Sequence, residues 1–159
     1  MAGAFRIRSE AFLSGGAIPR RHTGEGEDLS PSLRWDNVPE RCVELALIVD
    51  DPDAPGTSAW VHWVIYKIFC DEPGLAENIP SHNKLEDPHG AFQGRNSWGT
   101  IGYRGPLPPK GHGTHHYHFT LYALDEELNL APDLEKQALL KAISGHVLAT
   151  AELIGVYER

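Results

Sequence analysis

The sequence is poor in cysteine and in positive charge. Two cysteines in 159 residues are too few for a disulfide scaffold or a zinc ribbon. We therefore expect Cys42 and Cys70 to be buried thiols in a reducing compartment. The 14 lysines and arginines are outnumbered by 22 acids, giving a net charge of −8 with the histidines counted as neutral. Binding to DNA, RNA or an anionic membrane needs clustered Lys and Arg, so none of these is expected as the main partner.

Long apolar runs are also missing. No segment approaches the length that crosses a membrane, which argues against stable membrane insertion. The opening residues 1–12 are charged and lack the apolar centre of a signal peptide. A chain of 159 residues has the size of one domain with its own core. We expect a single domain over residues 1–159, soluble and cytoplasmic.

Several catalytic motifs are absent as well. The sequence contains no GxSxG nucleophile elbow, no HExxH zinc motif and no GxxxxGK[ST] phosphate loop. Neither cysteine stands beside a histidine in the sequence, so no activated thiol is indicated. We therefore expect a protein that is not an enzyme and that carries no cofactor.

What the sequence does contain is a series of β-type segments. Alternation or short apolar runs predict strands at 5–12, 33–35, 43–49, 60–69 and 115–125, with a shorter one at 91–94. Both alternating faces of 43–49 are apolar, so this strand is expected to be central and covered on both sides. Two C-terminal helices are predicted next, one from Pro132 and Asp133 to a stop at Gly145, and one over 146–157.

The stretch DDPDAPGTSAWVHW at 50–63 is the first candidate site. Pro52 and Pro55 end one predicted strand and stiffen the turn that follows. They fix the carboxylates of Asp51 and Asp53 just before a strand that carries His62. Carboxylates placed by a rigid turn beside an imidazole suit a small polar ligand. An ordinary Asx turn and a hydrogen-bonded core histidine would explain the same residues. We also expect a cis peptide between Asp51 and Pro52, since the chain turns sharply there.

The second candidate site is the Gly/Pro-rich end of residues 71–113. Gly102, Gly105, Gly111 and Gly113 alternate with prolines in IGYRGPLPPKGHG. Glycine permits exposed backbone N–H groups and proline removes loop entropy. The sequence therefore predicts a rigid loop whose amides bind an anion.

The strand predicted at 115–125 carries a cluster of histidines. Alternation places His115 and Tyr117 on one face and His116 and His118 on the other. The run HGTHHYH suggests zinc at first sight, but alternation splits its histidines and no cysteine or third histidine stands at metal spacing. We therefore expect no metal site.

Three motifs in this order resemble the phosphatidylethanolamine-binding protein family. They are DPDAP at 51–55, WVHW at 60–63 and GYRGPLPPKGHGTHHYHF at 102–119. The similarity is greatest to the bacterial and archaeal Raf-kinase-inhibitor-like branch. DLSPSLRW at 28–35 and the ending from residue 145 extend it over essentially the whole chain. The resemblance implies a mostly β, sandwich-like fold of two antiparallel sheets, the larger one central, with the two helices packed on the core. Members of that branch often form homodimers.

The resemblance also implies a pocket for phosphate or a phosphorylated headgroup. The matching positions are Asp51, Trp60, His62, Pro109, His115 and Tyr117, with Asp53, Gly102 and Gly105 in support. One departure is His116, which stands where the family usually has an arginine and removes a permanent charge.

Three functions from different classes fit these residues. The first is a non-catalytic binding protein with a small anion pocket, which regulates a partner such as a protein kinase or a protease. The second is a small-molecule hydrolase or isomerase that uses Asp51, His62 and His115 as general acid and base. The third is an interaction protein whose pocket is vestigial. The residues favour the first, because imidazoles, a tyrosine hydroxyl and loop amides together suit an oxyanion.

Overall fold

A computed structural model describes residues 3–159. Met1 and Ala2, where the segment judged to lack a signal peptide begins, lie outside the described residues. The strands are β1 (Arg6–Arg8), β2 (Leu33–Asp36), β3 (Glu44–Asp51), β4 (Trp60–Phe69), β5 (Gly74–Leu75), β6 (Phe92–Gln93), β7 (His115–Leu124) and β8 (Val147–Tyr157). The helical elements of this part of the chain are a 3-10 turn, η1 (Arg20–His22), and one α-helix, α1 (Lys136–Ile143).

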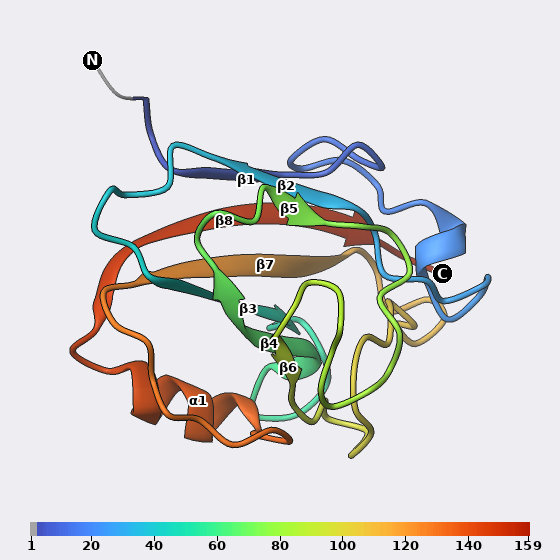
Figure 1. Cartoon of the computed structure of the whole chain (residues 1–159). Coiled ribbons are helices and arrows are strands. Elements are labelled where there is room, and N and C mark those ends of the chain that lie inside the picture. The colour runs from blue at the N-terminus through green and yellow to red at the C-terminus, as the bar shows by residue number, and fades with distance from the viewer. Residues whose placement is uncertain (1–2) are drawn as a thin grey trace.

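The elements stack in three layers, with the large sheet in the middle (Figure 1). The small sheet has the order β1-β2-β5, and the five-stranded sheet has the order β6-β4-β3-β7-β8. All the strand pairs within both sheets are antiparallel. Helix α1 covers the face of the large sheet that points away from the small one. The prediction of two antiparallel sheets with the larger one central is therefore confirmed.

Strand β3 is central, as its doubly apolar sequence predicts. Leu45, Leu47 and Val49 belong to the core between the two sheets. Ala46 and Ile48 point the other way, into the core under α1. Because both of its faces are covered, packing fixes the position of β3. This also fixes the position of Asp51 at its C-terminal end.

The second predicted helix is wrong. Residues 147–157 form β8, which pairs along its length with β7, from Leu124 opposite Val147 to His115 opposite Tyr157. The segment is apolar on almost every side and contains several β-branched residues, a composition that suits a buried strand as well as a buried helix. Burial of Ala151, Leu153 and Gly155 in β8 has period two, and this alternation distinguishes the two readings.

The first predicted helix exists but begins later than expected. Asp133 has a φ of +69°, a left-handed conformation that cannot continue into a helix, and α1 begins at Lys136. Leu139 and Ile143, one turn apart, are buried. Gly145, with a φ of +86°, stands just past the end of the helix, as predicted.

The free edge of β8 is partly covered by the loop before η1. The N–H of Gly15 donates to the carbonyl of Ile154, and the N–H of Ile18 donates to that of Val156. In return the N–H of Val156 donates to the carbonyl of Gly16. These bonds occupy the outward-facing backbone groups near the C-terminal end of β8.

Cys42 and Cys70 form a disulfide, so the prediction of two separate buried thiols is wrong. Cys42 precedes β3 and Cys70 follows β4, and the antiparallel pairing of Glu44 with Phe69 brings the two cysteines side by side. Their Cα atoms are 6.0 Å apart, within the range that a disulfide spans. The 28-residue separation in sequence gave no sign of this contact.

The expected cis bond between Asp51 and Pro52 is also wrong. Among residues 3–159 the cis peptide bond is the one between Asp87 and Pro88. A trans turn is sufficient at residue 51, because the N–H of Asp53 donates to Asp51 Oδ1 at 2.8 Å and fixes the carboxylate directly.

The other strands differ from expectation only in extent. The opening strand covers residues 6–8 of the predicted 5–12, because Ser9 leaves the sheet and its hydroxyl donates to the carbonyl of Ser32. Strand β3 runs on through Asp51, which therefore ends a strand and does not begin a loop. Strand β5 in the Gly/Pro-rich region and η1 were not predicted. Within residues 3–159 no helix is long and apolar enough to cross a membrane.

Candidate functional site

Three neighbouring strands of the large sheet bring the predicted site residues together. Asp51 ends β3, opposite Trp60 at the start of β4. Tyr117 and His115 lie near the start of β7, which pairs with the other side of β3. These three strand ends meet at one edge of the core between the sheets, so residues distant in sequence line the same cavity.

A β-bulge turns His62 towards this cavity. Val49 pairs with Trp63 but Asp50 pairs with Val61, so His62 is the extra residue on β4. Its ring lies edge-to-face against Tyr117, with the ring centroids 5.1 Å apart. In a regular strand, His62 and Trp63 would point to opposite faces of the sheet. Because of the bulge, both point towards the core between the two sheets.

The cavity has a volume of about 280 Å³. It is lined by Asp51, Ala54, Pro55, Trp60, His62, Trp98, Leu107, Pro108, Pro109, His115 and Tyr117. Six of these are positions that the sequence pointed to: Asp51, Trp60, His62, Pro109, His115 and Tyr117. The polar groups therefore converge on a small space with largely apolar walls.

Asp51 holds His115 in place. The carboxylate is almost completely buried and uses both of its oxygens. Oδ1 accepts the N–H of Asp53, and Oδ2 lies 2.7 Å from Nδ1 of His115. Because a carboxylate only accepts, Nδ1 of His115 must carry the hydrogen in this contact. The acid, which would repel an anionic ligand by itself, therefore orients an imidazole.

His62 is held by the backbone of the Gly/Pro-rich loop. Its Nδ1 lies 2.7 Å from the carbonyl oxygen of Arg104, and the N–H of Arg104 donates to the carbonyl of His62. A carbonyl only accepts, so Nδ1 carries the hydrogen and Nε2 of the neutral ring is an acceptor. Burial lowers the pKa of His62, although the Arg104 carbonyl and the Asp51 charge act in the opposite direction. The ring is therefore neutral near pH 7.

Tyr117 supplies a hydroxyl that keeps its proton. Burial raises its pKa well above the ordinary value, and the carboxylates of Asp51 and Asp53 raise it further. The side chain is nearly fully buried and lines the cavity. Its O–H can therefore donate a hydrogen bond at any physiological pH.

Asp53, Gly102 and Gly105 do not line the cavity. Asp53 Oδ2 accepts both the N–H and Nδ1 of His116, at 2.8 Å each. Burial works to raise the pKa of Asp53, but the hydrogen bonds from His116 and the nearby imidazole charges lower it overall. This contact fixes the turn after β3 to the start of β7.

The glycines shape the loop, and their amides are mostly engaged within the chain. The Gly105 N–H donates to Asp28 Oδ1 at 2.8 Å, and that of Gly102 donates to the carbonyl of Gly94. The Gly111 N–H donates to the carbonyl of Arg159. The expectation of a loop of free amides is therefore wrong at these three positions.

The sequence reasoning missed the aromatic and apolar walls. Trp98 packs edge-to-face on Trp60 at 5.4 Å and on His62 at 5.0 Å between ring centroids, and the Arg104 guanidinium lies 4.6 Å from a ring of Trp98. Leu107 and Pro108 close another side. A tryptophan in an otherwise Gly- and Ser-rich segment was the available signal for Trp98.

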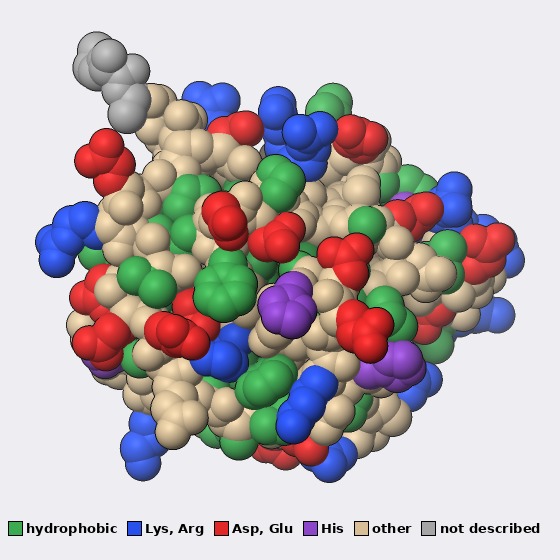
Figure 2. Space-filling model, viewed as in Figure 1, with side chains coloured by type: hydrophobic (Ala, Val, Ile, Leu, Met, Phe, Trp, Pro, Cys, Tyr) green, Lys and Arg blue, Asp and Glu red, His purple; other side chains and the backbone are tan. Residues whose placement is uncertain are grey.

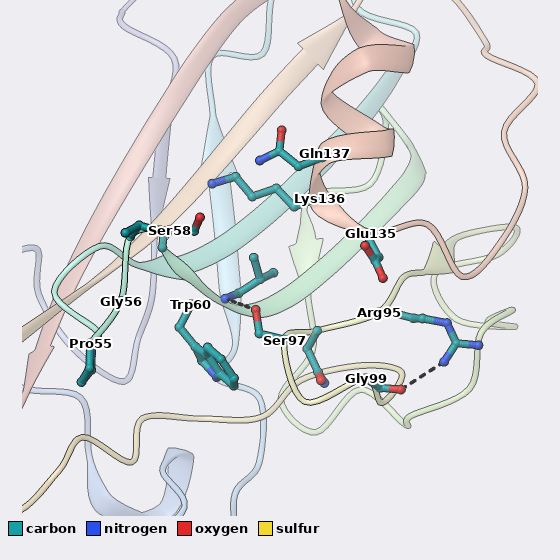
Figure 3. A pocket seen from close by; sticks show the side chains of 14 residues that line it. Pro55, Gly56, Ser58, Trp60, Arg95, Ser97, Gly99, Glu135, Lys136 and Gln137 are labelled. Atoms are coloured by element: carbon teal, nitrogen blue, oxygen red, sulfur yellow. Dashed lines mark hydrogen bonds between the residues drawn. The ribbon is translucent and has the colours of Figure 1, made fainter.

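A second cavity of about 560 Å³ adjoins the first (Figure 3). Pro55 and Trp60 belong to the walls of both. Most of the remaining wall residues are polar, and they include Arg95 and Lys136. Lys136 makes an ion pair with Asp50, on the face of β3 opposite to Asp51. Its charges are mixed, and in the described part of the chain no group of three or more potential metal ligands is found.

Acidic side chains are spread over the face shown in Figure 2, interleaved with basic and apolar ones. No broad basic surface is visible on that face, in keeping with the net charge of −8.

Comparison with known proteins identifies the class. The family model for phosphatidylethanolamine-binding protein matches residues 8–158. The chain therefore belongs to the phosphatidylethanolamine-binding protein family, and the predicted membership is confirmed. A UPF0098 protein of Methanothermobacter thermautotrophicus is 51% identical over 153 residues, which cover 96% of this chain and 98% of that protein.

Solved structures agree with this assignment. The crystal structure of E. coli YbcL, described as a new member of the mammalian PEBP family, has a TM-score of 0.91 at 34% identity, covering 99% of each chain. A putative PEBP homolog of Chlamydia trachomatis has a TM-score of 0.87 at 38% identity, covering 98% of each chain. These three similar proteins come from one archaeon and two bacteria.

Proposed function

We propose that the protein is a non-catalytic binding protein whose small cavity takes phosphate or a phosphorylated headgroup such as phosphoethanolamine. The observation that carries the proposal is the convergence of His62, His115 and Tyr117 on one cavity of about 280 Å³. Tyr117 donates from its hydroxyl and His115 can donate from Nε2 once it is protonated, whereas Nε2 of the neutral His62 ring can accept a hydrogen from the ligand. Donors on several sides of a small space suit a compact oxyanion.

The position of Asp51 supports the proposal. Both of its oxygens are already occupied, by the N–H of Asp53 and by Nδ1 of His115. The negative charge is therefore paired with the imidazole that would carry the positive charge. Together they form a neutral pair when His115 is protonated, which reduces the repulsion of an anion.

The alternative of a hydrolase or isomerase using Asp51, His62 and His115 has less support. The cavity walls carry no serine, threonine, cysteine or lysine. Of the nucleophile types that do line the space, Asp51 has both oxygens occupied and Tyr117 keeps its proton, so a general acid–base reaction of a water or of the ligand itself is the better-supported chemistry. A buried Asp–His pair at 2.7 Å is the one observation in its favour.

The proposal is tested by NMR titration of the protein with phosphate, phosphoethanolamine and a monoanionic phosphodiester. Saturable shifts should appear at His62, His115 and Tyr117, with no phosphoester turnover. His115→Gln should weaken binding, whereas His118→Gln should not, because His118 lies on the other face of β7, beside Glu152. Titrations that shift none of the cavity residues would refute the anion site, and turnover that His115→Gln abolishes would favour the enzyme.

The proposal extends to a protein partner, for which a kinase or a protease is the class suggested by the family. Trp60 and Leu107 at the cavity rim are 37% and 42% exposed, which suits contact with a partner surface. Leu107→Ser should weaken inhibition of such an enzyme, and Leu13→Ser, at an 83% exposed position outside the cavity walls, is the matched control. Equal inhibition by both variants would place the partner contact elsewhere.

A further inference from the structure

His112 contacts the nitrogen of His115 that a ligand would use. Nδ1 of His115 is directed to Asp51, and Nε2 lies 2.6 Å from Nδ1 of His112. The centroids of the two imidazole rings are 4.9 Å apart. His112 is exposed and is not part of the cavity wall, whereas His115 is buried and lines it. The three side chains form a continuous row from the buried carboxylate to solvent.

The row holds a limited number of protons. In the neutral pair, Nε2 of His115 carries no hydrogen and accepts Nδ1–H of His112. With one proton added, one imidazolium donates across the same contact to the other ring. With two protons added, hydrogens stand on both facing nitrogens, and they cannot remain 2.6 Å apart. The contact therefore persists in the first two states and breaks in the third.

We propose that His112 is a gate of the anion pocket: an anion and His112 compete for Nε2 of His115, and binding of the anion displaces His112 with uptake of a proton. The inference rests on the proposed anion site. An anion needs a hydrogen on Nε2, whereas Nδ1 keeps its own hydrogen for Asp51. His115 must therefore be an imidazolium in the complex, and its contact with His112 must be released.

Little packs against the two residues that flank His112 in its loop. Gly111 and Gly113 flank it with φ values of +76° and +91°, and there is open space around both. The backbone up to His112 is held, because Arg159 Nε donates to the carbonyl of Pro108, the Gly111 N–H donates to the carbonyl of Arg159, and the His112 N–H donates to the carbonyl of Pro109. Displacement can therefore be confined to the His112 side chain.

The charged and titratable groups around the pair are few. Asp51 on β3 faces His115, and Asp53 in the following turn lies within electrostatic reach of it. His62 on β4 and Tyr117 on β7 share the cavity with it. Lys110 lies in the loop two residues before His112, and Arg159 anchors the loop through its backbone and side chain. Glu158 accepts a hydrogen bond from the hydroxyl of Thr114, and His116 is held by Asp53. Of these groups, His62 is neutral near pH 7 and Tyr117 keeps its proton, and the contact to Nε2 of His115 is made by His112.

The test measures the affinity of dimethyl phosphate, a permanent monoanion, for wild type and His112→Ala. At about pH 8, above the ordinary imidazole value of about 6.5, His112→Ala should bind more tightly. The expected gain is about threefold to tenfold, because the anion no longer displaces an ordinary hydrogen bond. At about pH 5, where acid favours the doubly protonated state in which the contact is broken, the advantage of His112→Ala should disappear and the two proteins should bind equally.

His116→Ala is the matched control. It removes a neighbouring exposed imidazole that contacts Asp53, and it should leave the pH dependence as in wild type. Equal affinity of wild type and His112→Ala at both pH values would refute the gate while leaving the anion site intact. Weaker binding by His112→Ala at both pH values would also refute it, by making His112 a support for the ligand. No binding by any variant at either pH would refute the proposed function itself.

Discussion

Reducing the disulfide between Cys42 and Cys70 should lower the stability of the fold substantially. The two cysteines are separated by 28 residues. In the chain-entropy relation, a loop of that length contributes about 3.6 kcal/mol at 25 °C by restricting the unfolded chain. The folded state loses little, because Glu44 and Phe69 beside the cross-link are already paired across β3 and β4. Reduction therefore lowers stability mainly by giving the unfolded chain more conformational entropy.

Thermal unfolding with and without a reducing agent measures the effect. For a protein of this size each kcal/mol shifts Tm by about 2–4 °C, so a decrease of about 7–14 °C is expected. Cys42→Ser combined with Cys70→Ser should unfold at the temperature of the reduced wild type and should not respond to the reducing agent. A decrease below about 3 °C would contradict the chain-entropy reasoning, and it would mean that the unfolded chain keeps this hairpin closed. Dimethyl phosphate binding should be unchanged, since the pocket lies at the opposite end of the hairpin.

Three further predictions concern stability. Lys67→Met should lower the free energy of unfolding, measured with urea, by about 3–5 kcal/mol, because the buried carboxylate of Glu44 loses its ion pair. The double variant that also carries Glu44→Gln should recover part of this loss. The free energy of unfolding should decrease as pH falls below about 6.5, because His62 takes up a proton in the unfolded chain but not in the folded one, where burial lowers its pKa. His62→Gln should show a weaker dependence on acid. An unchanged dependence in that variant would contradict this assignment. Gly105→Ala should destabilise by about 1–3 kcal/mol, because its Cβ would lie 2.1 Å from the carbonyl oxygen of His22, and the same unfolding assay with a wild-type midpoint would disprove that crowding.

The fold was predictable where the period of the sequence was clear. The strands at 43–49, 60–69 and 115–125 have apolar patterns that need no knowledge of their partners. The strand at 147–157 cannot be predicted without knowing its partner. A segment that is apolar on most sides suits a helix as well as a strand, and here it becomes a strand by pairing with β7. The disulfide was missed for the same reason, since only the pairing of β3 with β4 brings Cys42 to Cys70.

The candidate site was predictable to the extent that its residues lie on strands. Asp51, His115 and Tyr117 follow from strand ends and alternation, whereas the direction of His62 depends on a bulge that no local pattern reveals. The position of Trp98 depends on how the Gly/Pro-rich loop folds back over β4. That path is fixed by long-range contacts such as the hydrogen bonds between Arg104 and His62, which sequence periodicity does not report.

The loop at residues 15–18 also limits how two copies of this chain can associate. Its hydrogen bonds to Ile154 and Val156 occupy backbone groups on the outer side of β8. A strand from another molecule cannot extend the sheet there, because the groups it would pair with are already used. A homodimer that forms by extending a sheet would therefore have to use the earlier part of β8 or another edge strand, and one that meets at residues 154–156 would have to do so through side chains.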